Sequence, residues 1–148
     1  MSTIKKILCP TDLSDECRPA LAMACEWAKR FGAELHLVHV VDGLTNPYPY
    51  LGPPFNEAAA WETMIRQKAH AALGAWPLPA GFESLKIVRE LRSGSPIVNI
   101  VEYAKATGTD LIVMGTHGRS GLSHLLLGSV AENVVRHATC SVLTVRPS

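Results

Sequence analysis

The fold of this chain is decided by residues 110–129, which read DLIVMGTHGRSGLSHLLLGS. The apolar run at 110–114 predicts a buried strand. Gly115 and Gly118 follow at once, where a strand must turn. A helical spacing of apolar residues begins after the small pair at 128–129. The stretch therefore predicts a strand, a glycine-rich loop and a helix in succession.

The glycines of this stretch indicate a binding site for an anion. Missing side chains at Gly115, Gly118 and Gly128 let backbone N–H groups approach a ligand closely. The start of the following helix adds unpaired N–H groups and a partial positive charge, which suit a phosphate. The pattern is not a P-loop, because no Gly-Lys-Ser/Thr follows a four-residue gap.

The same spacing resembles the nucleotide-binding signature of the universal stress protein family, in its ATP-binding branch. That signature is a glycine, two residues, a glycine, nine residues, a glycine, and then serine or threonine. Gly115, Gly118, Gly128 and Ser129 match it completely, and the resemblance covers nearly the whole chain. It implies ATP or another adenine nucleotide as ligand, with Mg²⁺ held mainly through the phosphates.

The composition indicates one compact domain spanning residues 1–148. Hydrophobic residues make up 47% of the chain and charged residues 18%, which argues against disorder. A formal net charge of +1 gives no support for nucleic acid or a membrane as partner. No signal peptide is expected, and the four cysteines form no C-x-x-C pair. A cytoplasmic protein with reduced thiols is therefore expected.

Strands and helices are predicted to alternate. The strands are predicted at residues 4–9, 34–41, 85–91, 110–114 and 141–145, and the helices at 15–31, 56–75, 95–108 and 129–136. This alternation predicts an α/β fold, a single open parallel five-stranded sheet with helices on both faces. The resemblance adds the strand order 3-2-1-4-5, which is Rossmann-like and similar to the adenine nucleotide alpha hydrolases.

Several side chains are assigned to structure. Apolar spacing predicts that the first two helices pack on the sheet through Leu21, Ala24, Ala28 and Phe31, and through Trp61, Ile65, Ala69 and Ala72. Cys17 and Cys25 are interpreted as small packing residues, because two helical turns separate them. His36 and His39 fall on opposite faces of a strand and are interpreted as structural histidines.

Asp12 stands just past the carboxyl end of the first strand, where ligands bind in open α/β sheets. The residues leave two interpretations open. Thr11, Asp12 or Ser14 caps the next helix, or Asp12 contacts a ligand. The resemblance implies that Asp12 contacts the adenosine part of the nucleotide, and that the backbone at Val40 reads adenine.

The loop and the last helix offer further contacts. Ser129 and Glu132 fit a capping box, and the alternative, in which Ser129 contacts a phosphate, is compatible with it. Arg119 suits phosphate oxygens, and His117 is a candidate pH-sensitive phosphate donor. His117 and His124 without a carboxylate are a poor metal site, so no metal ligand is assigned.

The predicted nucleotide-binding residues share positions at strand ends, in the glycine-rich loop or at the start of the last helix. They are Pro10, Thr11, Asp12, Val40, Met114, Gly115, His117, Gly118, Arg119, Gly128, Ser129 and Val130. No catalytic residue is assigned, because the loop holds no lysine and no acidic pair stands beside it.

The expected function is that of an ATP-binding regulatory protein in a stress response. ATP is expected to order residues 115–128 and so alter a surface that an unknown protein client reads. The resemblance implies slow hydrolysis at most, and a homodimer through the last strand, Ser141–Val145. The alternatives are an enzyme that cleaves or transfers the nucleotide, and a nucleotide-independent interaction module. The proline-rich residues 42–55 are predicted to be a connecting loop, with a recognition ligand for a partner domain as the alternative.

Overall fold

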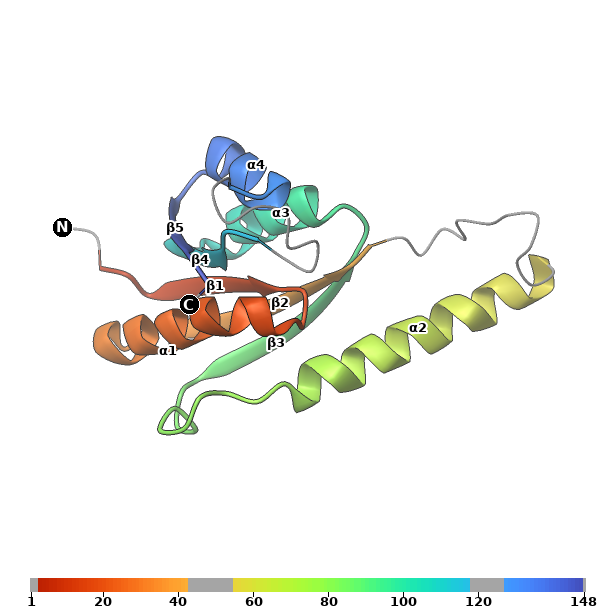
Figure 1. Cartoon of the computed structure of the whole chain (residues 1–148), viewed down its shortest axis with the longest axis horizontal. Coiled ribbons are helices and arrows are strands. Elements are labelled where there is room, and N and C mark those ends of the chain that lie inside the picture. Colours follow the sequence, from red (N-terminus) through yellow and green to blue (C-terminus); the bar gives the residue numbers. More distant parts are fainter. Residues whose placement is uncertain (1–2, 43–54, 118–126, 148) are drawn as a thin grey trace.

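The structure is a computed structural model that describes residues 3–42, 55–117 and 127–147. Strands and helices alternate along these ranges (Figure 1). The strands are β1 (Lys6–Thr11), β2 (Glu34–Val41), β3 (Ile87–Ser93), β4 (Leu111–Gly115) and β5 (Ser141–Val145). The helices are the short 3₁₀ helix η1 (Asp15–Cys17), α1 (Arg18–Phe31), α2 (Phe55–Ala75), α3 (Pro96–Thr107) and α4 (Ser129–His137).

The strands form one parallel sheet in the order β3-β2-β1-β4-β5, which confirms the predicted fold. β1 and β4 are neighbours although they are far apart in the sequence, with Ile7 opposite Leu111 and Leu8 opposite Ile112. After β1 the chain continues into α1 on one face of the sheet, and after β4 it continues into α4 on the other face. A crevice is expected at the carboxyl ends of these two strands, because the connections diverge there.

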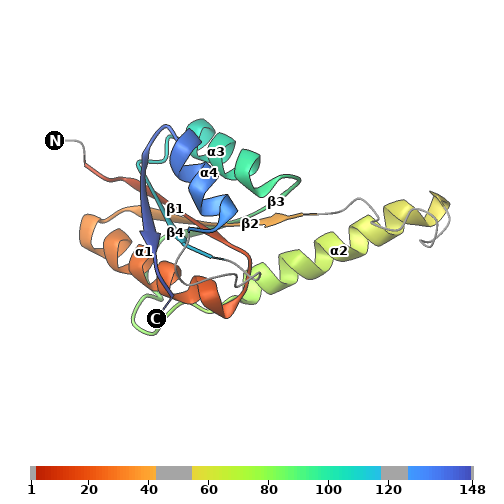
Figure 2. The same ribbon diagram turned by 45° about the horizontal axis from the view of Figure 1, so that its top comes forward.

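Helices cover both faces of the sheet, α1 and α2 on one face and α3 and α4 on the other (Figure 2). The core of the first face includes Ile7, Leu21 and Leu73. The core of the second face includes Leu8, Ile100 and Val134. Strands that are buried on both faces need apolar residues at successive positions, which explains the continuous apolar runs of β1 and β4.

The ends of α1 and α3 follow their sequence signals. The Ser95 hydroxyl accepts a hydrogen bond from the Val98 amide at 3.4 Å, and Pro96 occupies the first turn of α3. Gly32 and Gly108 end α1 and α3 with φ angles of 64° and 66°. Glycine adopts this left-handed conformation without strain.

Both predicted apolar stripes are wrong at particular positions. Phe31 is 41% exposed at the last residue of α1, and Trp61 is 46% exposed in α2. In both views the N-terminal part of α2 extends beyond the sheet (Figures 1 and 2). Ala72 is also exposed. The inner stripe of α2 consists of Ile65, Ala69 and Leu73.

β1 and β3 begin and end later than predicted, at Lys6–Thr11 and Ile87–Ser93. Pro10 was expected in a loop, but it lies inside β1 opposite Val38. The predicted edge position of β3 is confirmed. Residues 43–54 of the proline-rich connection lie outside the described residues.

The two histidines of β2 are structural, as predicted. His36 is 5% exposed, its Nδ1 lies 2.7 Å from the Tyr103 hydroxyl, and its Nε2 contacts Glu34. His39 donates from Nδ1 to the Thr11 carbonyl at 2.9 Å. Each ring therefore has a protein partner. Within the described ranges, no helix has the length and apolar character needed to cross a membrane.

Candidate functional site

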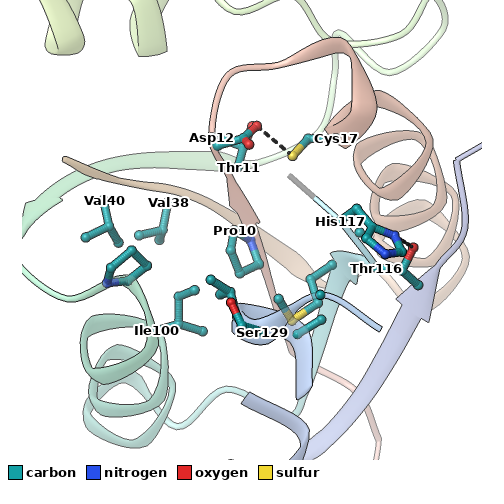
Figure 3. A pocket seen from close by; sticks show the side chains of 16 residues that line it. Pro10, Thr11, Asp12, Cys17, Val38, Val40, Ile100, Thr116, His117 and Ser129 are labelled. Atoms are coloured by element: carbon teal, nitrogen blue, oxygen red, sulfur yellow. Dashed lines mark hydrogen bonds between the residues drawn. The ribbon is translucent and has the colours of Figure 1, made fainter. Parts of the chain in front are cut away.

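A cavity of about 240 Å³ opens between the carboxyl ends of β1 and β4 (Figure 3). Its walls come from β1 and the turn after it, from β2, from the first half of α3, and from the end of β4 with the start of α4. The volume lies just below the roughly 300–1,000 Å³ of typical small-molecule sites. The cavity therefore has room for a compact part of a ligand.

All the predicted site residues that the structure describes line this cavity. They are Pro10, Thr11, Asp12, Val40, Met114, Gly115, His117, Gly128, Ser129 and Val130. Gly118, Arg119 and His124 lie outside the described residues. The structure thus brings together side chains and backbone from β1, β2, β4 and α4.

The turn after β1 is held by its own side chains. Oδ1 of Asp12 accepts hydrogen bonds from the Ser14 amide at 3.0 Å and from the Ser14 hydroxyl. The Thr11 hydroxyl accepts from the Leu13 amide at 3.0 Å. Ser14 is the N-cap of η1 but makes no side-chain cap hydrogen bond. Neither η1 nor α1 has a side-chain cap hydrogen bond, so the capping interpretation is wrong. Asp12 fixes this turn and lines the cavity, and its contact with a ligand stays a prediction.

Leu13 adopts a backbone conformation that is sparsely populated outside glycine, asparagine and aspartate. Its φ is 61°, in the left-handed region. Such strain persists only where the surroundings hold the residue in place. The hydrogen bonds of Thr11 and Asp12 supply this restraint, and they fix where the Asp12 carboxylate stands.

The start of α4 packs directly on the end of β4. The Gly128 amide donates a 2.7 Å hydrogen bond to the Thr116 carbonyl. Its N–H is therefore engaged within the protein, and any backbone donors for a ligand at this end of α4 come from the residues after Gly128. The next amides, in the first turn of α4, have no partner within the helix, as at any helix N-terminus. They face the region where an anion is stabilised by the helix dipole.

The predicted capping box at Ser129 is also wrong. The N-cap of α4 is Gly128, with no side-chain cap hydrogen bond, so Ser129 is the first helical residue. Glu132 does not reach back but accepts a 3.1 Å hydrogen bond from Arg136. The N-cap is therefore one residue earlier than the capping-box pattern of Ser129 and Glu132 predicted. The Ser129 side chain is exposed and lines the cavity.

His117 supplies an unsatisfied polar atom beside the cavity. Its Nδ1 lies 3.0 Å from the Thr116 hydroxyl. Its Nε2 is buried and has no hydrogen-bond partner among the described residues. A buried polar atom without a partner costs about 1–3 kcal/mol. A polar ligand that reaches this nitrogen removes that cost, so the site fits a ligand with a hydrogen-bonding group here.

The two sides of the cavity differ in chemistry. Val38, Val40 and Ile100 lie on one side, and Thr116 and His117 lie on the opposite side (Figure 3). This arrangement suits a molecule with a flat, weakly polar ring at one end and a polar or anionic group at the other.

Sequence reasoning missed several lining residues, namely Cys17, Val38, Pro96, Ile100, Thr116 and Ala131. Val38 could have been predicted from the sequence, because it lies two residues before Val40 and its side chain is therefore on the same face of β2. Pro96 and Ile100 lie in α3, where no site residue was predicted. Cys17 was interpreted as a packing residue, but it lines the cavity and contacts Asp12 at 3.0 Å.

The described lining residues carry a single carboxylate, that of Asp12. Within the same described ranges, no group of three or more His, Cys, Asp and Glu side chains is arranged to hold a metal ion. The described polar groups that line the cavity are hydrogen-bond donors and acceptors.

Comparison with known proteins places this arrangement among related sequences and structures. A family model described as the universal stress protein family matches residues 3–146. A universal stress protein of Methanocaldococcus jannaschii is 40% identical over 145 residues, which cover 96% of this chain and 82% of the relative. The solved structure of hypothetical protein MJ0577 is 28% identical, with a TM-score of 0.82 over 99% of each chain. A solved universal stress protein in complex with cAMP is 26% identical, with a TM-score of 0.63, over 99% of this chain and 100% of its own.

Proposed function

This chain belongs to the universal stress protein family, and on that premise we propose that it binds an adenine nucleotide in the cavity between β1 and β4. The observation that carries the proposal is Nε2 of His117, which is buried and has no hydrogen-bond partner among the described residues. His117 lies across the cavity from an apolar wall (Figure 3). The cAMP complex of a solved relative supports the same class of ligand.

The base and sugar are assigned to the apolar side. Val38, Val40 and Ile100 form a surface on which a purine ring packs, and the Val40 backbone can read its edge. Asp12 accepts hydrogen bonds from the adenosine part, because an ionised carboxylate offers acceptors only. This side of the cavity gives the site its selectivity for the nucleoside.

The phosphates are assigned to the opposite side. Nε2 of His117, the Ser129 hydroxyl and the first-turn amides of α4 are the groups that would meet them. Backbone amides at a helix N-terminus favour negative charge. ATP is the proposed ligand, with Mg²⁺ held mainly by the phosphates, since Mg²⁺ needs few protein ligands when phosphates supply oxygens.

We propose a regulatory role in a stress response rather than a dedicated enzymatic one. Phosphoryl transfer needs a positioned base or water-orienting group. Asp12 is the single carboxylate among the described lining residues, and its Oδ1 already accepts three hydrogen bonds. Nucleotide binding is instead proposed to change the surface around the crevice, which a protein client reads. Steady turnover of ATP to ADP would contradict this role.

We also propose a homodimer formed through β5. In the described sheet, β5 pairs with β4 alone, so its other edge is open to a strand of a second copy. Sedimentation velocity is expected to give the mass of two chains. A cytoplasmic location is proposed as well, because all four cysteines are free thiols.

Calorimetric titration of the purified protein tests the ligand assignment. ATP with Mg²⁺, adenosine and inorganic tripolyphosphate are titrated separately. ATP is expected to bind more tightly than either part alone, because it engages both sides of the cavity. Identification of any small molecule that co-purifies with the protein gives an independent check.

A further inference from the structure

We propose that Cys17 is a positioning residue for nucleotide recognition, whose thiol holds the Asp12 carboxylate in the orientation that meets the adenosine part of the ligand. The inference rests on the proposed function and assigns a role to a side chain outside the glycine signature.

The geometry joins Cys17 to both the cavity and Asp12. Cys17 ends η1, is the N-cap of α1, and is 7% exposed. Its Sγ lies 3.0 Å from Oδ1 of Asp12 and also lines the cavity (Figure 3). The contact ties the turn after β1 to the first helix, so the carboxylate is held from the helical layer as well as from its own turn.

The direction of the hydrogen bond follows from the protonation of both groups. Burial raises the pKa of the Cys17 thiol to about 11; a hydrogen bond with the Asp12 backbone opposes this rise in the pKa, and the Asp12 carboxylate adds to it. Cys17 is therefore a neutral thiol near pH 7, and its S–H is a donor. An ionised carboxylate accepts hydrogen bonds only, so the thiol donates to Oδ1 of Asp12.

Three donors then converge on one carboxylate oxygen. The Ser14 amide and hydroxyl come from the turn, and the Cys17 thiol comes from the start of the helices. The turn donors fix the position of Oδ1 along the chain. The thiol approaches from a different element, so its removal takes away one of the three donors that restrain the carboxylate and leaves the turn's own hydrogen bonds in place.

The chain provides a matched control thiol in Cys25. It lies on α1, is fully buried and belongs to the core of the first face. It is not among the lining residues of the cavity. Substitution of Cys25 therefore reports the effect of losing a packed thiol, and substitution of Cys17 reports the same effect plus the loss of the donor to Asp12.

The test uses calorimetric titration of the full chain with Mg·ATP and, separately, with inorganic tripolyphosphate. The variants are Cys17→Ala, Cys17→Val, Cys17→Ser and the control Cys25→Ala, each checked for folding by thermal melting. Alanine and valine remove the donor, and valine keeps most of the volume. Serine keeps a donor.

Cys17→Ala and Cys17→Val are expected to raise the Kd for ATP about tenfold, as expected for losing one hydrogen bond to a charged group. Their Kd for tripolyphosphate is expected to stay within about twofold of the original value, which corresponds to a change of about 0.4 kcal/mol in binding free energy. Cys17→Ser and Cys25→Ala are expected to bind both ligands like the original chain. If Cys17→Ala does not fold, the comparison of Cys17→Ser with Cys17→Val decides the question.

Two results overturn the inference. ATP affinity that is equal in the original chain and in Cys17→Val shows that the thiol does not position Asp12. Equal loss in Cys17→Ser and Cys17→Val shows that only the fit of the sulfur matters. Both results leave the proposed function standing, because the original chain still binds ATP. Failure of the original chain to bind any adenine nucleotide removes the proposed function and this inference together.

Discussion

Gly128 packs so closely on Thr116 that a Cβ atom at position 128 would lie 2.6 Å from the Thr116 carbonyl oxygen. That oxygen is backbone, so it cannot move aside as a flexible side chain would. The glycine therefore sets how closely α4 approaches the end of β4. Because both elements line the cavity, the same contact sets the distance between the helix N-terminus and the strand ends.

Gly128→Ala is expected to lower the free energy of unfolding by about 1–3 kcal/mol, as overpacking of a tight site does, and to weaken ATP binding as α4 shifts. Urea denaturation and calorimetric titration measure the two effects. Gly74→Ala is the control, because a Cβ there meets nothing within 4 Å and Gly74 lies inside a helix. The control is expected to be stabilised by roughly 0.5–1 kcal/mol. Unchanged stability and affinity in Gly128→Ala would contradict the role given to this contact.

Asp12→Asn is expected to weaken adenosine and ATP binding without weakening tripolyphosphate binding. Asparagine keeps an acceptor oxygen for the Ser14 amide, so the turn should survive. The loss of the carboxylate removes one acceptor for the nucleoside and one negative charge from the cavity. Asp15→Asn is the control, since Asp15 is exposed and pairs with Arg18 at the surface. Equal weakening of tripolyphosphate by Asp12→Asn would show that Asp12 meets the phosphates.

His117→Ala is expected to have the opposite profile. It should weaken ATP and tripolyphosphate while leaving adenosine affinity unchanged, because the imidazole is assigned to the phosphate side. The matched control is His137→Ala, an exposed histidine at the end of α4. If His117→Ala loses affinity for adenosine and keeps its affinity for tripolyphosphate, the nucleoside and not the phosphates binds beside His117, which contradicts the assignment.

Tyr103→Phe is expected to destabilise the fold without altering nucleotide affinity. It removes the hydroxyl that lies 2.7 Å from Nδ1 of buried His36 and leaves that nitrogen without this partner. The expected loss is about 1–3 kcal/mol in urea denaturation. Val98→Ala on the same helix is 51% exposed and should change stability by less than about 0.5 kcal/mol. Tyr103 does not line the cavity, so a changed ATP affinity would contradict this assignment.

Glu34 gives the fold a pH-dependent contribution at acidic pH. The Lys86 side chain, and after it His36, lowers the pKa of Glu34 from 4.5 to about 2 by hydrogen bonding to its carboxylate. A lowered pKa in the folded state stabilises the fold above the unfolded pKa, and this stabilisation is lost as pH falls from 4.5 towards 2. The melting temperature of Glu34→Gln should therefore lie below that of the original chain at pH 6. The two melting temperatures should converge as the pH falls through that window, and a constant difference would contradict the assignment.

Much of the fold was predictable because local signals agreed with the global arrangement. Ser95, Gly32 and Gly108 mark helix ends by their own conformational preferences. The strand order was not predictable from composition, because it depends on which apolar faces meet in three dimensions. It came from the resemblance. The exposed Trp61 shows the limit of periodicity, since the pattern could not tell where α2 passes the edge of the sheet.

The site was predictable where it follows strand ends. Asp12 directly follows β1 and Gly115 ends β4, and parallel strands bring such ends to one edge. Ile100 and Cys17 were missed because their place at the cavity depends on how α3 and η1 pack, not on any local pattern. Gly128 was predicted as a site residue, but its packing on Thr116 was not predictable from the sequence. Its missing side chain accommodates a backbone carbonyl of the protein itself.

A crystal structure of the protein grown with saturating Mg·ATP tests the central claim most directly. The account predicts density for the nucleotide between the ends of β1 and β4, with the base against Val40 and Ile100 and the phosphates towards His117 and the start of α4. An ATP molecule bound elsewhere, or this cavity left without nucleotide at saturating ATP, would contradict it.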